Sequence, residues 1–223
     1  MLSTLCGAAL AMDIETEHVQ HIVTKQNLEP DPAFRQLENW PWRVMIRLLG
    51  EPGIVVDGKA LHIDARRQSK PLELIHALAA LGGEARAEVL ADLLWPDALG
   101  DAAMDSFKTT LNRARNKLGV DDALQLKGGR LSFASELVWI DAAALSALAN
   151  SLPDGGDPVN GPRTTETGPV HTVDETIIDI YRGDLLDEVY HGWVDKPRQR
   201  LRELWVRAVL RRATALSNDG HHA

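Results

Sequence analysis

The stretch DSFKTTLNRARNKLG, residues 105–119, decides which fold the sequence predicts. Its apolar residues recur at spacings of four, three and four: Phe107, Leu111, Ala114 and Leu118. This spacing lines one side of an α-helix, which we expect to begin after the cap Asp101 and to end at Gly119. The opposite side is polar and consists of Lys108, Thr109, Asn112, Arg113 and Asn116.

A β-hairpin is predicted directly after this helix. The runs 124–126 and 131–133 flank the tight turn Lys127-Gly128-Gly129-Arg130, and glycine favours such turns. The hairpin therefore has a basic tip. Residues 137–140 predict a further strand, and the alanine-rich residues 141–150 predict a short helix.

Upstream, the pattern predicts short strands followed by two more helices. Residues 43–49 alternate as a strand does, and the β-prone runs 54–56 and 59–63 flank an Asp57-Gly58 turn. A helix is expected from the cap Ser69, with Pro71 in its first turn and Gly82-Gly83 at its end. Its apolar face consists of Leu72, Ile75, Leu78 and Ala79.

The second of these helices is expected over residues 86–95, and Pro96 stops it. Its apolar side is predicted to hold Val89, Leu90, Leu93 and Leu94. Residues 1–27 are expected to form a helical segment and 28–41 a connector. Residues 151–171 are rich in proline and glycine and predict a flexible linker, while 173–182 and 197–217 are expected to be helical.

Strands, three helices and a hairpin in this order predict an α+β winged helix, with N-terminal β-strands and a C-terminal β-hairpin wing, followed by a helical module. The expected boundaries are a helical segment and linker at 1–42, a DNA-binding domain at 43–140, and a helical domain at 141–223 with a flexible part at 151–172. A helix with a polar front can lie in a DNA major groove, where Arg and Asn pair with base edges. Lys127 and Arg130 at the hairpin tip could then reach the neighbouring minor groove or phosphates. The alternative is that this polar side is merely solvated.

The net charge of −8 does not exclude DNA, because the charge is unevenly distributed. Residues 104–119 hold four cations and one anion, and residues 196–212 hold seven cations and one anion. Two basic segments therefore interrupt an acidic chain. The second could hold DNA or an acidic partner, or be a solvated helix face whose arginine stems cover apolar surface.

Residues 44–140 resemble the OmpR/PhoB-type winged-helix domain of the Streptomyces antibiotic regulatory proteins. The motifs that carry this resemblance are LADLLWPD at 90–97, the helix at 105–119 and VWID at 138–141. Residues YRGDLL at 181–186, WV at 193–194 and RLR at 200–202 are similar to the start of the bacterial transcriptional activator domain that follows in that family, a tetratricopeptide-like helical repeat. Residues ENWPW at 38–42 resemble the entry to this module in MalT-like regulators, which implies an excised part of a longer regulator.

The resemblance implies a bacterial transcription regulator whose recognition helix is the helix at 105–119. Carried over by position, Thr109, Asn112, Arg113 and Asn116 face bases, whereas Lys108 and Arg115 face phosphates. Asn112 and Asn116 stand where many relatives have basic residues, so the target sequence does not carry over. The loop 97–101 corresponds to the family's contact region for RNA polymerase. Binding of relatives in pairs to direct repeats implies a homodimer on double-stranded DNA.

Other functions have weaker support in the sequence. GIVVDGKA at 53–60 fits GxxxxGK but has Ala60 where a phosphate loop needs Ser or Thr. His18 and His21 lack a third metal ligand nearby, and the single Cys6 excludes a multi-cysteine zinc site. We therefore expect no metal, no cofactor, no enzymatic activity and no membrane segment, in a cytoplasmic protein. The remaining alternative is a protein-interaction or ligand-sensing module on a winged-helix scaffold with little or no DNA binding.

Overall fold

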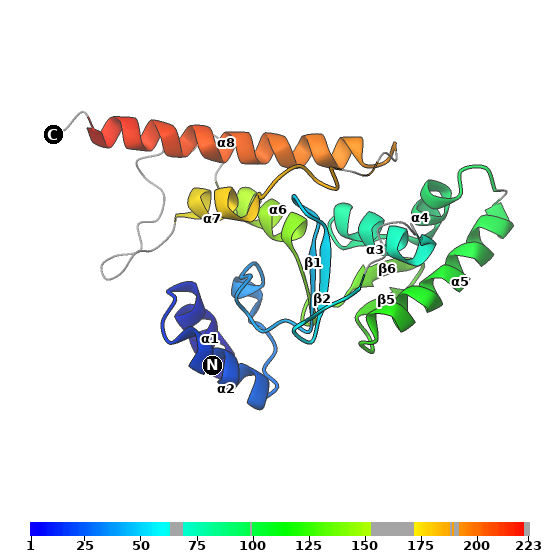
Figure 1. The fold of residues 1–223 in the computed structure, drawn as a ribbon, viewed down its shortest axis with the longest axis horizontal. Coiled ribbons are helices and arrows are strands. Elements are labelled where there is room, and N and C mark those ends of the chain that lie inside the picture. Colours follow the sequence, from blue (N-terminus) through cyan, green and yellow to red (C-terminus); the bar gives the residue numbers. More distant parts are fainter. Residues whose placement is uncertain (63–68, 99, 153–171, 188, 190–191, 221–223) are drawn as a thin grey trace.

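The computed structural model describes residues 1–62, 69–98, 100–152, 172–187, 189 and 192–220. Helices and short strands follow one another in groups along these residues, so the chain has an α+β fold (Figure 1). The strands form a four-stranded and a three-stranded sheet. Within the described residues, every helix is either too short or too polar to cross a membrane.

The four-stranded sheet joins the two ends of the region between residues 44 and 140. Its strands are β1 (Val44–Arg47), β2 (Gly53–Val56), β3 (Lys59–Ala60) and β7 (Val138–Ile140), in the order β3-β2-β1-β7. β1 runs antiparallel to β2 and parallel to β7, with Val44 opposite Val138. Alternate side chains of β1 are buried, as the alternating sequence predicts.

Three helices and the second sheet lie between these strands along the chain. They are α3 (Lys70–Ala80), α4 (Ala87–Leu94) and α5 (Gly100–Leu118), and α3 and α4 each pack against α5. The three-stranded antiparallel sheet has the order β4-β6-β5, from β4 (Glu84–Arg86), β6 (Arg130–Phe133) and β5 (Leu124–Lys127). The predicted order of strands, helices and hairpin is therefore present.

The C-terminal helices pack on one another and are joined to the first sheet. They are α6 (Asp141–Ser151), α7 (Val173–Ile180) and α8 (Asp195–Gly220), and α8 lies along the other two in Figure 1. The Leu186 N–H donates to the Leu48 carbonyl at 2.8 Å, and the Gly50 N–H donates to the Asp184 carbonyl at 3.2 Å. These bonds tie the segment after α7 to the end of β1.

A buried carboxylate fixes α6 to the same place. Asp141 is fully buried, and its Oδ2 accepts from the N–H groups of Leu48 at 2.7 Å and Leu49 at 2.9 Å. Its Oδ1 accepts from the Ala142 N–H at 2.7 Å. Burial raises the pKa of Asp141 to about 6, and the three N–H donors act against that shift.

The N-terminal segment forms two helices and a short 3-10 turn. These are α1 (Leu2–Ala11), α2 (Thr16–Lys25) and η1 (Pro32–Phe34). Glu38 in the connector accepts from Arg47 of β1 at 2.9 Å and from Arg182 after α7 at 2.7 Å. The connector is thus bonded both to the first sheet and to the C-terminal part of the chain.

Several local predictions were wrong in detail. Val89 is 47% exposed, because α4 buries Ala87, Leu90, Ala91 and Leu94 instead. Asp101 does not cap α5, which begins one residue earlier at Gly100. The segment 1–27 is helical, as predicted, and consists of two helices, with positive φ angles at Asp13 and Glu15 between them. Residues 153–171, most of the predicted linker, lie outside the described residues.

Candidate nucleic-acid interface

The back of α5 is held in the core by the apolar stripe that the sequence predicts. Phe107 and Ala114 are fully buried, and Leu111 and Leu118 nearly so. Ala103 and Thr110 are buried as well, which widens the stripe to the width that packs on both α3 and α4. The orientation of α5 about its own axis is therefore fixed.

The front of α5 is exposed, and it presents polar side chains. Lys108, Thr109, Asn112, Arg113 and Asn116 all have exposed side chains. Arg113 makes neither a hydrogen bond nor an ion pair with any part of the chain that the structure describes. A guanidinium that has no partner within the protein keeps its five N–H donors for a ligand.

Two other cations of α5 are held by the protein itself. The Lys108 ammonium lies 3.4 Å from Asp105 one turn earlier, in an exposed ion pair that contributes little stability. Arg115 is half-buried, and its Nε donates to the Leu124 carbonyl of β5 at 3.1 Å. This bond orients Arg115 along the junction between α5 and the hairpin.

The hairpin that follows α5 turns at two glycines. Lys127 pairs with Arg130 across the turn, and Gly128 and Gly129 have φ angles of +55° and +75°. A two-residue hairpin turn with positive φ at both positions favours glycine, because a side chain would strain it. The basic tip that the sequence predicts is therefore formed.

The cations at the tip also have partners in the protein. Arg130 forms an ion pair with Glu84 of β4, and the Lys127 ammonium donates to the Gln125 side chain at 2.6 Å. The Ala87 N–H at the start of α4 donates to the Gly129 carbonyl at 2.9 Å. These contacts fix the tip relative to α4 and α5. Sequence reasoning missed Glu84, because it lies 46 residues before its partner.

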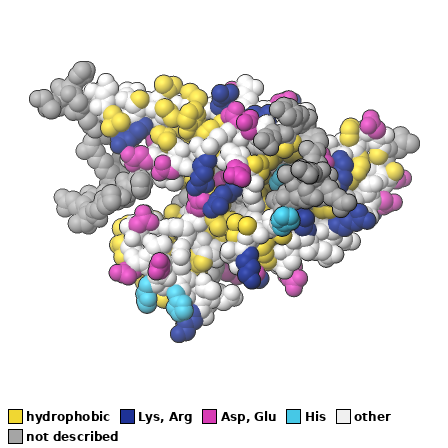
Figure 2. Space-filling view, in the orientation of Figure 1, with side chains coloured by type: hydrophobic (Ala, Val, Ile, Leu, Met, Phe, Trp, Pro, Cys, Tyr) yellow, Lys and Arg dark blue, Asp and Glu magenta, His cyan; other side chains and the backbone are white. Residues whose placement is uncertain are grey.

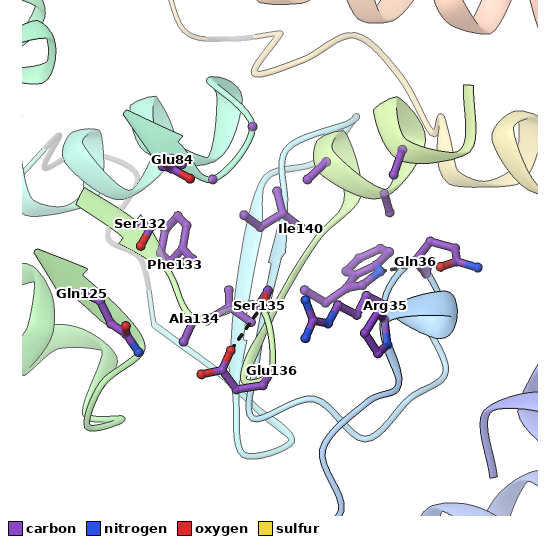
Figure 3. A pocket seen from close by; sticks show the side chains of 18 residues that line it. Arg35, Gln36, Glu84, Gln125, Ser132, Phe133, Ala134, Ser135, Glu136 and Ile140 are labelled. Carbon is purple, nitrogen blue, oxygen red and sulfur yellow. Dashed lines mark hydrogen bonds between the residues drawn. The ribbon is translucent and has the colours of Figure 1, made fainter. Parts of the chain in front are cut away.

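Two hollows border this region. One, of about 810 Å³, lies between the C-terminal end of α5 and β5 and is lined by Arg115, Asn116, Asp121, Asp122 and Lys127 among others. The other, of about 610 Å³, lies between β6, α6 and the connector, with Arg35 on one side and Glu84 and Glu136 on others (Figure 3). The first brings three of the predicted site residues around one depression.

The second basic segment does not form a continuous free patch. On α8, Arg198 donates to the carbonyls of Leu185 at 2.9 Å and Leu186 at 2.7 Å. Arg211 pairs with Asp174 at 2.6 Å, and Arg212 pairs with Glu175 at 2.6 Å. Much of the positive charge counted between 196 and 212 is therefore used to attach α8 to α7 and to the segment before α8.

The remaining candidate sites are less complete. Residues 53–60, which fit the phosphate-loop pattern, form the β2–β3 hairpin. The Arg43 guanidinium bonds to Asp57 at its turn at 2.9 Å. A phosphate loop would instead connect a strand to a helix. Among the described residues, no group of three His, Cys, Asp or Glu side chains could hold a metal. The predicted polymerase loop 97–101 includes residue 99, which lies outside the described residues, and its last two residues belong to α5.

Comparisons with known proteins add a distant likeness. No family model matches the chain, and no curated protein matches it. Among solved structures, the chain is similar to Mycobacterium tuberculosis EmbR in complex with a low-affinity phosphopeptide, at 16% identity and a TM-score of 0.44. The match covers 74% of this chain and 43% of the EmbR chain, so it spans less than half the length of that protein.

Proposed function

We propose that the chain is a sequence-specific DNA-binding transcription regulator built on a winged helix. In this proposal α5 is the recognition helix and the β5–β6 hairpin is the wing. The observation that carries the proposal is the exposed polar front of α5, where Arg113 has no partner among the described residues, next to a glycine-tipped basic hairpin. An α-helix with such a front fits the major groove, which is about 12 Å wide.

The proposed contacts divide into bases and phosphates. Thr109, Asn112, Arg113 and Asn116 face bases, since amide and guanidinium groups pair bidentately with adenine and guanine. Lys108, Arg115, Lys127 and Arg130 contact phosphates. The bond from Arg115 to the Leu124 carbonyl supports its role, because it holds the guanidinium at the junction of helix and wing.

The salt dependence of binding to random duplex DNA tests this function. We expect the logarithm of the association constant to fall linearly with the logarithm of salt concentration, with a slope of about −0.9 per phosphate contacted. Four contacts give a slope between about −3 and −4. Fluorescence anisotropy of a labelled duplex with the full chain measures it, and Lys108→Gln should make the slope shallower by about one. No binding of the duplex even at the lowest salt would refute the proposal.

A protein-interaction or ligand-sensing module remains a second candidate function. The observations that favour it are the net charge of −8 and the ion pairs that occupy Lys108 and Arg130. In that case duplex DNA would fail to bind at low salt. A partner protein or small molecule would instead raise the midpoint of thermal unfolding, since binding to the folded state stabilises it.

We further propose that the turn before α5 contacts RNA polymerase and that two copies bind neighbouring DNA repeats. Both the polymerase contact and the pairing of two copies rest on the resemblance to the OmpR/PhoB-type regulators. Asp97 is exposed in this turn. Asp97→Lys should lower transcription from a target promoter in a reconstituted assay without lowering DNA affinity. Equal loss of both would contradict a separate polymerase contact.

A further inference from the structure

Exposed hydrophobic side chains gather at two places on the described part of the chain. The first, here the α1 patch, consists of Met1, Leu2, Leu5, Met12 and Ile14. The second, here the α8 patch, consists of Val206 and Leu210, and Leu216 is exposed six residues further along α8 on another side of the helix. Large hydrophobic groups that cluster on a surface mark interaction sites more often than single exposed ones do.

The α1 patch covers one side and the two ends of α1, a helix that is apolar on both sides. Residues 2–11 contain no charged side chain, and Cys6, Gly7 and Leu10 are buried against the rest of the protein. Leu2 and Leu5 are one helical turn apart on the other side, and Leu5 is 63% exposed. A helix that is hydrophobic all round is normally covered all round.

The α8 patch lies on the outer side of the longest helix. α8 buries Leu201 and Ala208 towards the other C-terminal helices, whereas Val206 and Leu210, one turn apart, point away from that side. Leu210 is 61% exposed and Leu216 54%. Figure 2 shows hydrophobic side chains gathered over the C-terminal half of α8, at the upper left.

The charges beside the two patches are opposite in sign. Asp13, Glu15 and Glu17 are exposed next to the C-terminal end of α1. Arg207 and Arg202 are exposed at the N-terminal end of the α8 patch; Arg202 also lies 3.8 Å from Asp184, and the neighbouring Glu203 accepts from Gln199 at 3.0 Å. Exposed complementary charges steer two surfaces together and fix their orientation.

We propose that the α1 patch of one copy binds the α8 patch of a second copy. Pairing the acidic end of α1 with the basic end of the α8 patch makes the two helices antiparallel. Because each copy carries both patches, a twofold axis forms the contact twice and closes a dimer.

The same contact cannot form within one chain. α1 is held to the turn η1, where the Thr4 hydroxyl donates to Asp31 at 2.7 Å, and in Figure 1 it lies on a different side of the molecule from α8. Both patches are also separate from the front of α5. The inference therefore goes beyond DNA binding and stands independently of it.

Sedimentation velocity of the full chain without DNA, over a range of concentrations, tests the dimer. Leu5→Glu and Leu210→Glu should each weaken dimerisation at least tenfold, because each places a charge in an apolar contact. Val89→Glu is the matched control, since Val89 is an exposed hydrophobic residue outside both patches and should leave dimerisation unchanged. Circular dichroism checks that each variant keeps its helical content.

A charge exchange tests the orientation of the two helices. Asp13→Arg and Arg207→Asp should each weaken the dimer, and the two together should restore it. A chain that stays monomeric at every concentration would overturn the proposal, as would a dimer that resists both glutamate substitutions. Loss of the dimer with Leu210→Glu but not with Leu5→Glu would also overturn it, because α8 would then pair with itself.

Discussion

Helices α5 and α8 both carry clusters of cations, but the protein uses these cations differently. On α8, Arg198, Arg211 and Arg212 bond to groups of the chain itself. On α5, Arg113 points to solvent without a partner among the described residues. Several of the cations of α8 are therefore bonded within the protein, although Arg200 is exposed without a partner among the described residues, and net charge alone does not locate a DNA-binding surface.

The difference arises from what lies opposite each helix. α8 packs on α7, whose first turn supplies Asp174 and Glu175 to Arg211 and Arg212. The helices α3 and α4 pack on the apolar side of α5, and among the described residues the polar side chains of its front are exposed. A cation without a partner in the fold is the one that can bind a ligand without first breaking a bond.

The largest expected effect is the difference in unfolding free energy between replacing Arg198 and replacing Arg113. Arg198→Ala should lower the free energy of unfolding by roughly 3–4 kcal/mol, because it leaves buried carbonyls of Leu185 and Leu186 without their charged donor. Arg113→Ala should change it by less than about 0.5 kcal/mol, as for other exposed positions. Urea denaturation measures both, and equal losses would contradict the comparison.

Asp141 extends the comparison to a buried anion that bonds to backbone N–H groups. Its pKa in the folded protein, about 6, lies above the usual 3.8, so the folded chain binds more protons between these values than the unfolded chain does. The contribution of Asp141 to the free energy of unfolding is therefore fully present below pH 3.8, and it is lost as the pH rises through 6. The loss amounts to about 3 kcal/mol.

Asp141→Asn removes this titration. From pH 4 to pH 7 the natural chain should lose about 2 kcal/mol of unfolding free energy relative to the variant, because the carboxyl of the unfolded chain is already largely deprotonated at pH 4. Urea denaturation at several pH values measures the shift. A constant difference over that range would show that Asp141 does not titrate within it.

The Arg211–Asp174 pair should give a smaller effect. Its nitrogen and oxygen are 2.6 Å apart and both side chains are part-buried, so a coupling of about 1–2 kcal/mol is expected, between the values for exposed and for buried pairs. A double-mutant cycle with Arg211→Gln and Asp174→Asn isolates that coupling. The exposed Lys108–Asp105 pair on α5 serves as the control, where the coupling should stay below about 1 kcal/mol.

The sequence predicted those features that depend on neighbouring residues. The stripe from Phe107 to Leu118 and the Gly128-Gly129 turn are both present, because periodicity and backbone preference act within a few residues. Helix α4 shows the limit of that approach. Four of its side chains are large and apolar, and which of them is buried depends on where α5 and β4 lie.

Contacts between distant residues could not be predicted. The bonds of Asp141 to Leu48 and Leu49 span more than 90 positions, and that of Arg182 to Glu38 spans 144. The same limit applies to the candidate site. The exposure of Arg113 followed from the helical pattern, whereas the partners of Arg115 and Arg130 depend on how the hairpin packs.

The most direct test of the central claim compares the DNA affinity of Arg113→Ala with that of Arg200→Ala. Arg200 is an exposed arginine of α8 without a partner among the described residues, so it matches Arg113 in charge and exposure. On a duplex selected for binding by the full chain, Arg113→Ala should weaken binding at least tenfold, about 1.4 kcal/mol, and Arg200→Ala less than twofold. Unchanged affinity for Arg113→Ala in a folded protein, or a larger loss for Arg200→Ala, would contradict α5 as the recognition helix.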